Sequence, residues 1–374
     1  FVEIGNFTDK LFEKGGAILD NGFVQERPNL ERYSTIAFNP KTLKSELVDI
    51  TSFTRHPVNE ELYKLKTDTG RSLTVTKSHS LFTAKNGKVI SVKTSDLQAG
   101  DFIVGSKKIP SLFVGEPIID LLPYLGDLRI SIKDDSAINN LISNHKKNFS
   151  KLEEKDREVA EKVLFDYFKG CYKEEMAHKH KIHPRRVRRI LTNLGLKNQP
   201  RVKEALPDKI IISKDIARFL GYYISEGCPV KDSQTVQITN YNNEILEDCY
   251  KIIEKEFGIY GDLRYEDHCI LFNSKQLKYV LSKVLKCGKN AYEKRVPKEL
   301  LLTNKDIISD LLYGLFSGDG GIRIRTKGRE INYGSKSKGL TEDINFLLLQ
   351  FGLVPTLEFN KTSKMFNLHI YNAE

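Results

Sequence analysis

The chain has 374 residues, 40% of them hydrophobic, which is enough for two or three domains with sizeable cores. Its net charge of +10 favours an anionic partner, nucleic acid before a membrane surface, over a merely lysine- and glutamate-rich, thermophile-like protein. The sequence contains no run of 18 consecutive apolar residues, so no membrane-spanning helix is predicted. A secretory signal is not expected either. Five cysteines without a C-x-x-C pair indicate a reducing compartment, so we expect a cytoplasmic protein.

Residues 1–110 are predicted to form a compact β-rich domain. Short stretches of alternating polar and apolar residues, such as 61–67 and 71–83, are separated by Asp-Thr-Gly and Lys-Asn-Gly sequences. Alternation of this kind is typical of strands, and these tripeptides are typical of tight turns.

Residues 111–205 are charged and are predicted to be helical, with a helix-turn-helix between 173 and 196. Pro184 suits a first helical turn, and the apolar stripe after it makes residues 184–194 the candidate recognition helix. Four arginines would crowd its exposed sides and contact DNA: Arg185, Arg186, Arg188 and Arg189. The alternative is a solvated basic helix within a helical linker.

Residues 206–374 contain an internal repeat. An apolar helix with an internal glycine ends on an acid followed by glycine at 219–228 and again at 311–321, 93 residues later. Each copy continues with a predicted hairpin and then an amphipathic helix that ends in Phe-Gly. The pattern indicates one α/β unit built twice.

The repeated helices each carry a glycine and a carboxylate, Gly221 with Glu226 and Gly314 with Asp319. Glycine inside a helix costs about 1 kcal/mol relative to alanine, which suggests that the two helices pack closely at these positions. Paired helices would bring the two acids together. Close carboxylates repel unless a cation lies between them, and oxygen ligands suit Mg²⁺, which can activate water and stabilise phosphoryl charge.

A simpler alternative is that the glycines after the acids, Gly227 and Gly320, cap the helix C-termini. Capping would leave each acid in solvent. It would not explain the glycines inside the helices, the duplication, or the acid in both copies.

The two motifs resemble those of single-chain LAGLIDADG homing endonucleases. The resemblance implies a monomer with a pseudo-twofold αββαββα fold that cuts double-stranded DNA at a long site. It assigns two or three divalent ions to Glu226 and Asp319. Strands after each motif would grip DNA, and the basic side chains expected there are Arg323, Arg325, Lys336 and Lys338, with Ile322 and Ile324 on a buried face.

Residues 293–300 resemble the Lys-x-Ile-Pro block of the same family, with Val296 in place of isoleucine. The resemblance places Lys294 near the scissile phosphate, where it would help to activate water or offset developing charge. Lysine before proline is common, so this spacing is a weak signal by itself.

The β-rich part resembles the Hint domain of inteins, in which a Thr-x-x-His element precedes a Leu-x-x-Gly-Asp element. Here these are Thr76 with His79, then Leu97, Gly100 and Asp101. The resemblance implies that Thr76 and His79 act on the N-terminal splice junction by general acid–base chemistry. A histidine near a strand end is more often structural when no second motif accompanies it.

Together these features predict a multidomain α+β protein similar to large archaeal inteins. We expect an incomplete β-rich, horseshoe-shaped Hint domain (1–110), a basic helical DNA-recognition region (111–205) and an incomplete endonuclease domain (206–374), flanked by host-protein segments. Phe1 and the final residues do not match splice junctions, so we expect no self-splicing by the chain as it stands. The alternatives are a non-catalytic DNA-binding regulator and a splicing-only intein with a decayed endonuclease.

Overall fold

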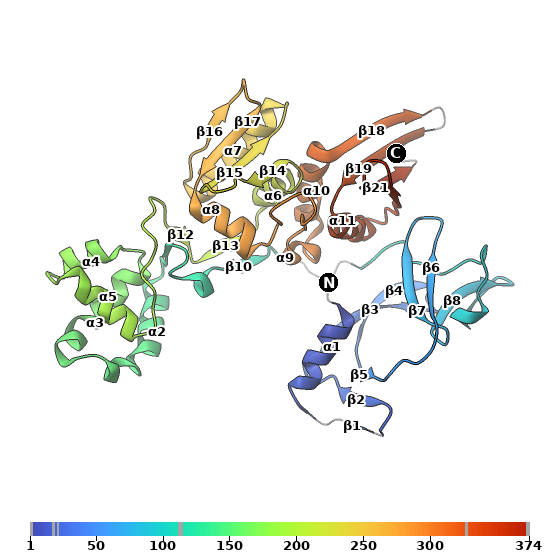
Figure 1. Cartoon of the computed structure of the whole chain (residues 1–374), viewed down its shortest axis with the longest axis horizontal. Coiled ribbons are helices and arrows are strands. Elements are labelled where there is room, and N and C mark those ends of the chain that lie inside the picture. The colour runs from blue at the N-terminus through green and yellow to red at the C-terminus, as the bar shows by residue number, and fades with distance from the viewer. Residues whose placement is uncertain (1–2, 17–18, 21, 111–114, 326–327, 372–374) are drawn as a thin grey trace. The chain divides into compact units, whose positions relative to one another are not determined.

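The structure, a computed structural model, describes residues 3–16, 19–20, 22–110, 115–325 and 328–371 (Figure 1). Its internal contacts divide the chain into two units. The first comprises residues 1–114, 301–305 and 320–374, and the second comprises residues 115–300 and 306–319. The first break lies close to the predicted end of the β-rich domain, whereas the predicted endonuclease residues 206–374 are shared between the two units.

The first unit opens with an unexpected helix, α1 (Ile4–Glu13), in a stretch predicted to be mainly β. Leu11 and Phe12 of this helix form a small core with Phe53. Antiparallel strands follow as a sheet of order β1-β2-β5 and as the hairpins β3-β4, β6-β7 and β8-β9. Their bounds are β1 (Leu19–Asp20), β2 (Gln25–Pro28), β3 (Ser34–Asn39), β4 (Lys44–Asp49), β5 (Ser52–Arg55), β6 (Leu62–Lys66), β7 (Ser72–Thr76), β8 (Ser80–Lys85) and β9 (Lys88–Lys93).

The β8-β9 hairpin shows why the turn sequences predicted strands correctly. Lys85 pairs with Lys88, which leaves Asn86 and Gly87 as a two-residue loop. Both residues have positive φ angles, 53° and 73°. This conformation matches the twist of the flanking strands, and an Asn-Gly pair adopts it easily. A 3₁₀ turn (Thr94–Asp96) follows β9.

The other part of the first unit is a four-stranded antiparallel sheet of order β18-β19-β21-β20. Helix α11 (Lys338–Gln350) packs on β19 and β21. The buried side chains Tyr333, Leu368 and Leu347 contribute to the core of this part. The strands are β18 (Gly320–Arg325), β19 (Gly328–Ser335), β20 (Thr356–Asn360) and β21 (Met365–Tyr371).

The second unit begins with a helical region, drawn in green in Figure 1. Short strand pairs flank it, with β10 (Ile118–Asp120) against β13 (Lys209–Ile211) and β11 (Ile130–Ser131) against β12 (Leu206–Pro207). Its helices share one apolar core around Tyr167 and Ile190. They are α2 (Asp135–Lys146), α3 (Glu154–Phe168), α4 (Lys173–Lys179) and α5 (Pro184–Asn193), with 3₁₀ turns at Leu122–Tyr124 and Phe149–Lys151.

The remainder of the second unit is α/β. Helix α6 (Lys214–Glu226) leads into a sheet of order β14-β15-β17-β16. Its strands and helices are β14 (Gly227–Pro229), β15 (Thr235–Thr239), α7 (Asn243–Phe257), β16 (Asp262–Arg264), β17 (Cys269–Asn273), α8 (Lys275–Tyr279), a π-helical segment (Val280–Val284), α9 (Lys298–Leu301) and α10 (Lys305–Asp319). Helix α7 ends at Gly258, whose φ of 63° is the left-handed conformation that glycine favours at a helix C-terminus.

The internal repeat in the sequence corresponds to a repeat in topology. After α6 and after α10, the chain forms four strands with a helix between the second and third, and the two sheets have equivalent strand orders. Within the described ranges, no helix is long and apolar enough to cross a membrane. All five cysteines are free thiols.

Candidate nuclease and splicing sites

Helices α6 and α10 meet at two glycines. A β-carbon added to Gly221 would lie 2.4 Å from the carbonyl oxygen of Leu311 and 2.8 Å from the α-carbon of Gly314. A β-carbon on Gly314 would lie 2.2 Å from the carbonyl oxygen of Arg218. All three distances are shorter than a β-carbon tolerates from backbone atoms, so no residue larger than glycine fits either position without a shift of the backbone. The two backbones are therefore in direct contact.

This contact continues to the ends of the helices, where the two acids lie. A β-carbon on Gly318 would be 2.8 Å from the γ-carbon of Glu226 and 2.4 Å from the hydroxyl of Ser225. Asp319 is the next residue after Gly318 and the last residue of α10. The helix pair therefore ends with Glu226 beside the turn that carries Asp319. No local pattern around Gly318 distinguishes it from other glycines, because its role depends on Glu226 and Ser225 of the other helix.

Gly227 does not act as a left-handed cap. It follows Glu226 with φ of −92° and ψ of 152°, which is extended backbone, and it begins β14. Glycine is required at this position because a β-carbon there would lie 2.3 Å from the ring of Tyr223, too close for any larger residue. Gly227 is nevertheless the C-cap of α6, because its amide donates to the Tyr223 carbonyl. The part of the capping alternative that fails is the solvated acid, since Glu226 is half-buried.

Lys294 is buried beside the ends of these helices, with 5% of its surface exposed. Its ammonium group donates hydrogen bonds to the carbonyl oxygens of Tyr223 (2.8 Å) and Gly227 (2.5 Å) and lies 4.5 Å from the centre of the Tyr223 ring. Burial lowers the pKa of Lys294 to about 8, although nearby negative charges that include Asp319 and Glu226 act in the opposite direction. The lysine and both acids thus belong to one electrostatic site.

Glu226 is half-buried, whereas Asp319 is exposed. Burial raises the pKa of the Glu226 carboxyl, while a hydrogen bond from Asn240 and the positive charge of Lys294 lower it. The Asn240 amide donates to Glu226 Oε1 at 3.3 Å. Asn240 follows β15, and sequence reasoning missed it because nothing local to its strand points to a carboxylate 14 residues earlier.

The donor set suits a hard cation. Carboxylate and amide oxygens are the ligands that Mg²⁺ prefers, and Mg²⁺ usually binds through one or two carboxylates while keeping several waters. Across the described ranges, no group of three or more His, Cys, Asp or Glu side chains could hold a metal ion by itself. Glu226 and Asp319 are the side chains at the ends of α6 and α10 that could hold a divalent ion, with its remaining ligands supplied from outside the protein.

The Thr76–His79 element forms a tight turn between β7 and β8. The His79 amide donates to the Thr76 carbonyl (3.1 Å), and the buried Thr94 holds the His79 carbonyl through its hydroxyl (2.9 Å) and its amide (2.9 Å). His79 itself is exposed. Gly100, at the matching Leu-x-x-Gly-Asp element, has a φ of 103°, a conformation that glycine adopts readily.

The four arginines of α5 fall into two classes. Asp156 of α3 is fully buried and accepts hydrogen bonds from Arg186 (2.7 Å) and from Arg189 (2.9 Å). These pairs hold both side chains against the helical core. Arg185 and Arg188 are exposed. They are the arginines of this helix that are free to meet an external anion, and the DNA-recognition role of α4 and α5 stays a prediction.

The basic residues expected on strands after the second motif are only partly on strands. Arg323 is exposed on β18, whereas Lys336 follows β19 and Lys338 begins α11, where it pairs with Glu342 (3.2 Å). Arg325 ends β18, and its side chain lies outside the described residues.

The expected burial on the other face of β18 is wrong. Ile322 is 72% exposed and Ile324 is 87% exposed. The strand order makes β18 an edge strand, and α11 packs on β19 and β21 rather than on β18.

Comparisons with known proteins cover nearly the whole chain. The family model described as the intein splicing domain matches residues 18–334, and that of a LAGLIDADG-like domain matches residues 306–374. A DNA polymerase of Thermococcus aggregans is 24% identical and covers 99% of this chain, and an uncharacterized protein of Methanocaldococcus jannaschii is 26% identical and covers 89% of it. The chain spans only 23% and 37% of these relatives, respectively.

Two solved structures are also similar to parts of the chain. A transcription factor IIB mini-intein is 27% identical, with a TM-score of 0.27 over 30% of this chain and 61% of its own. I-DmoI in complex with DNA and Mn is 17% identical, with a TM-score of 0.33 over 42% of this chain and 90% of its own. Because the first family model matches far more than half of the sequence, this chain belongs to the intein splicing domain family and carries a LAGLIDADG-like domain.

Proposed function

We propose that this intein acts as a homing endonuclease that cuts both strands of DNA at a long site, the intein insertion site, with Mg²⁺. The observation that carries the proposal is the convergence of Glu226, Asp319 and Lys294 at the ends of two helices in backbone contact. A cut through both DNA strands involves two scissile phosphates, one in each strand. Two acids, one from each helix, therefore suit such a cut.

Each of the three residues has a defined task in this proposal. Glu226 and Asp319 would hold divalent ions, which supply charge stabilisation at the phosphate and activation of water. Asn240 holds Glu226 in place through its amide. Lys294, with a pKa of about 8, can hold or release a proton near neutral pH and place positive charge where the leaving oxygen becomes negative.

DNA affinity would come from basic side chains on separate elements. Arg185 and Arg188 of α5 and Arg323 of β18 are exposed. Contacts of this kind to phosphates make binding steeply dependent on salt, because each contact releases counterions. We propose that Lys336, Lys338, Arg186 and Arg189 contribute through the general basic field of the chain. The protein would act as a monomer in the cytoplasm.

Cleavage of a supercoiled plasmid tests the proposal directly. The plasmid would carry the host gene without its intein, and the matches to polymerases make a replicative host the first choice. The double variant Glu226→Gln, Asp319→Asn removes both charges, and Asp306→Asn, at the opposite end of α10, is the matched control. A Mg²⁺-dependent linear product from the parent chain and the control, but not from the double variant, is the expected result.

Other outcomes would replace the proposal. Cleavage by the double variant would show that the paired acids do not carry the reaction. Salt-sensitive binding of the same site without a cut by any chain would favour a DNA-binding regulator with this fold.

We also propose that Thr76 and His79 support protein splicing when suitable flanking segments are present. His79 is exposed on a turn fixed by Thr94, so its imidazole is accessible to a junction amide. The chain would be expressed behind an upstream segment that ends in Cys or Ser at the junction. His79→Ala should abolish thiol-induced N-terminal scission, whereas His56→Ala should leave it intact, and equal scission by both variants would reject this role.

A further inference from the structure

Two crossings of the chain connect the helical region with the α/β part of the second unit. The crossing that enters the helical region includes β11, the one that leaves it includes β12, and these strands pair in parallel. One side chain, Gln276 of α8, binds both crossings. Its carbonyl oxygen accepts from the Arg129 amide (2.6 Å), and its amide group donates to the Glu204 carbonyl (2.5 Å). Only 2% of the Gln276 surface is exposed, so water competes little for these two bonds.

Helix α8 is also fixed to the sheet of the α/β part. Leu277 is buried, and α8 contacts β15. The Lys278 ammonium group donates to the carbonyl oxygens of Val230 (2.7 Å) and Ser233 (2.6 Å), in the turn between β14 and β15. Helix α8 therefore joins this sheet to both crossings.

The Arg129 side chain extends the connection to α4 and α5. Its guanidinium donates to the Tyr172 hydroxyl (2.6 Å) and to the Val202 carbonyl (2.8 Å), and it lies 4.0 Å from the centre of the Tyr172 ring. Tyr172 is the N-cap of α4, and α4 shares its apolar core with α5. Consecutive contacts thus run from the sheet through α8 and Arg129 to the candidate recognition helix.

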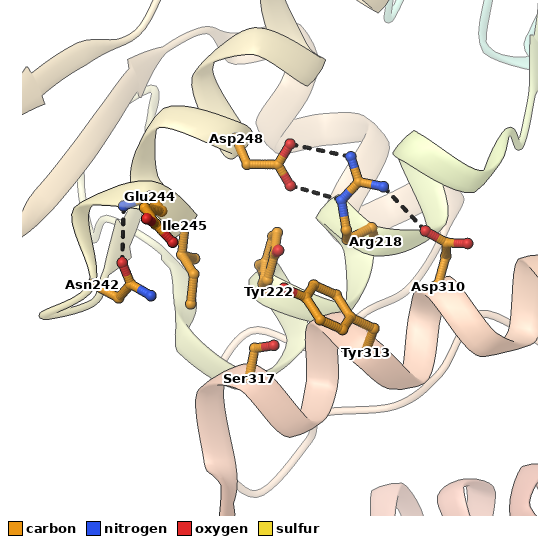
Figure 2. A pocket seen from close by; sticks show the side chains of 9 residues that line it. All are labelled: Arg218, Tyr222, Asn242, Glu244, Ile245, Asp248, Asp310, Tyr313 and Ser317. Carbon is orange, nitrogen blue, oxygen red and sulfur yellow. Dashed lines mark hydrogen bonds and ion pairs between the residues drawn. The ribbon is translucent and has the colours of Figure 1, made fainter.

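The α/β part is held together at the helix pair as well. Arg218 of α6 donates to both oxygens of Asp248 on α7 (2.7 and 3.1 Å) and to Asp310 on α10 (3.0 Å), as Figure 2 shows. One guanidinium therefore ties α6, α7 and α10 together, and α6 and α10 end at Glu226 and Asp319. The paired acids and α5 thus lie at the two ends of one chain of close contacts.

We propose that Gln276 and Arg129 are positioning residues that hold α5 at one distance and orientation from the paired acids, so that the protein accepts a single spacing between two DNA subsites. The inference rests on the proposed function, in which the acids cut an inner subsite and α5 contacts an outer one. One inserted base pair moves the outer subsite by about 3.4 Å and rotates it by about 34°. A rigid connection does not follow this change, whereas a loose one does.

Binding to DNA duplexes with altered spacing tests the inference without a cut, because Mg²⁺ is left out. The duplexes carry the insertion site of the host gene. Hydroxyl-radical footprints of the parent chain and of the Arg185→Ala, Arg188→Ala double variant locate the outer subsite, and one or two base pairs are then inserted between the subsites. The parent chain should bind the altered duplexes about tenfold more weakly than the unaltered one.

Variants of Gln276 should relax this discrimination. Gln276→Ala should bind altered and unaltered duplexes within about twofold of each other, because its helical region can follow the moved subsite. Gln276→Glu keeps the acceptor for the Arg129 amide but not the donor to Glu204, so it should fall between the parent and Gln276→Ala. This second variant keeps the test decisive if Gln276→Ala does not fold.

NMR relaxation of the DNA-free protein measures the same connection independently. The amides of α2–α5 and of α6–α7 should report one rotational correlation time in the parent chain and two in Gln276→Ala. Gln350→Ala is the matched control, because Gln350 is also a buried glutamine on a helix, and its amide group donates to the Leu301 carbonyl (2.8 Å). It should keep a single correlation time and the strict spacing even where it lowers the melting temperature.

The outcomes separate this inference from the proposed function. Equal binding of altered and unaltered duplexes by the parent chain, or unchanged discrimination in both Gln276 variants, would overturn the inference. Cleavage without an outer footprint would also overturn it and would leave the nuclease proposal standing. Strict spacing in binding without a Mg²⁺-dependent cut would support the inference and reject the nuclease.

Discussion

Gly221 and Gly314 face each other across the helix pair, and a β-carbon on Gly314 would lie only 2.9 Å from the α-carbon of Gly221. Gly221→Ala should therefore destabilise the protein by about 1–3 kcal/mol, because backbone atoms of α10 would have to move away. Chemical denaturation measures this directly. Cleavage should fall as well, since the separation of the acids depends on the same contact.

Gly5→Ala is the matched control for this prediction. Gly5 lies inside α1 with nothing within 4 Å of its added β-carbon, so alanine there should be neutral or stabilising by up to about 1 kcal/mol. Equal stabilities for Gly221→Ala and Gly5→Ala would contradict the tight packing of α6 against α10.

The buried lysine predicts an unusual dependence of stability on pH. Its folded-state pKa of about 8 lies below the ordinary 10.5, so between these values the unfolded chain binds more protons than the folded chain. The free energy of unfolding should therefore rise with pH across this window, by about 3 kcal/mol from this residue alone.

The comparison that isolates this effect is parent chain against Lys294→Met, which keeps the side-chain length and removes the charge. The difference between their unfolding free energies should increase in favour of the parent from pH 8 to pH 10.5. A difference that stays constant over this range would mean that Lys294 titrates normally.

Asn240 should influence the ionisation of Glu226. Its hydrogen bond lowers the pKa of a carboxyl that burial raises, so Asn240→Ala should raise that pKa further. The acidic limb of the pH–cleavage profile should move to higher pH, because cleavage needs ionised Glu226. Gln237→Ala, on β15 just before Asn240, is the control that should leave the profile in place.

The two classes of arginine on α5 should respond differently to truncation. Arg188→Ala should weaken DNA binding and reduce the slope of log affinity against log salt by about 1, with stability unchanged. Arg189→Ala should instead lower the free energy of unfolding by about 1–3 kcal/mol, because it leaves Oδ2 of the buried Asp156 without its partner while Arg186 still donates to Oδ1. Salt-dependent binding assays and denaturation of both variants check this contrast.

Local patterns were sufficient for much of the fold. The candidate recognition helix was predicted at residues 184–194 and is observed at Pro184–Asn193, because proline at the start and a clear apolar stripe define it. The Asn-Gly turn and the glycine that ends α7 were equally predictable from the sequence, because few residues other than glycine and asparagine adopt their positive φ angles.

What the sequence could not supply depends on contacts between distant residues. Arg186 and Arg189 look like any exposed basic residues until Asp156, 30 or more positions earlier, is found beneath them. The need for glycine at position 227 was equally undetermined, because its close contact with the Tyr223 ring becomes visible only in the fold. The exposure of Ile322 and Ile324 follows from the edge position of β18, which alternation along a single strand does not reveal.

Glu226 is the last residue of α6, and Gly227 begins β14 with no linker between them. A shift of that strand would therefore move the Glu226 carboxylate, because a single peptide bond joins the two residues. Lys294 would move with it, since its ammonium group donates a hydrogen bond to the Gly227 carbonyl. A protein that grips DNA with these strands would couple the fit of the bound sequence to its turnover rate. Imperfect sites would then be held yet cut slowly, so fidelity would be set after binding as well as during it.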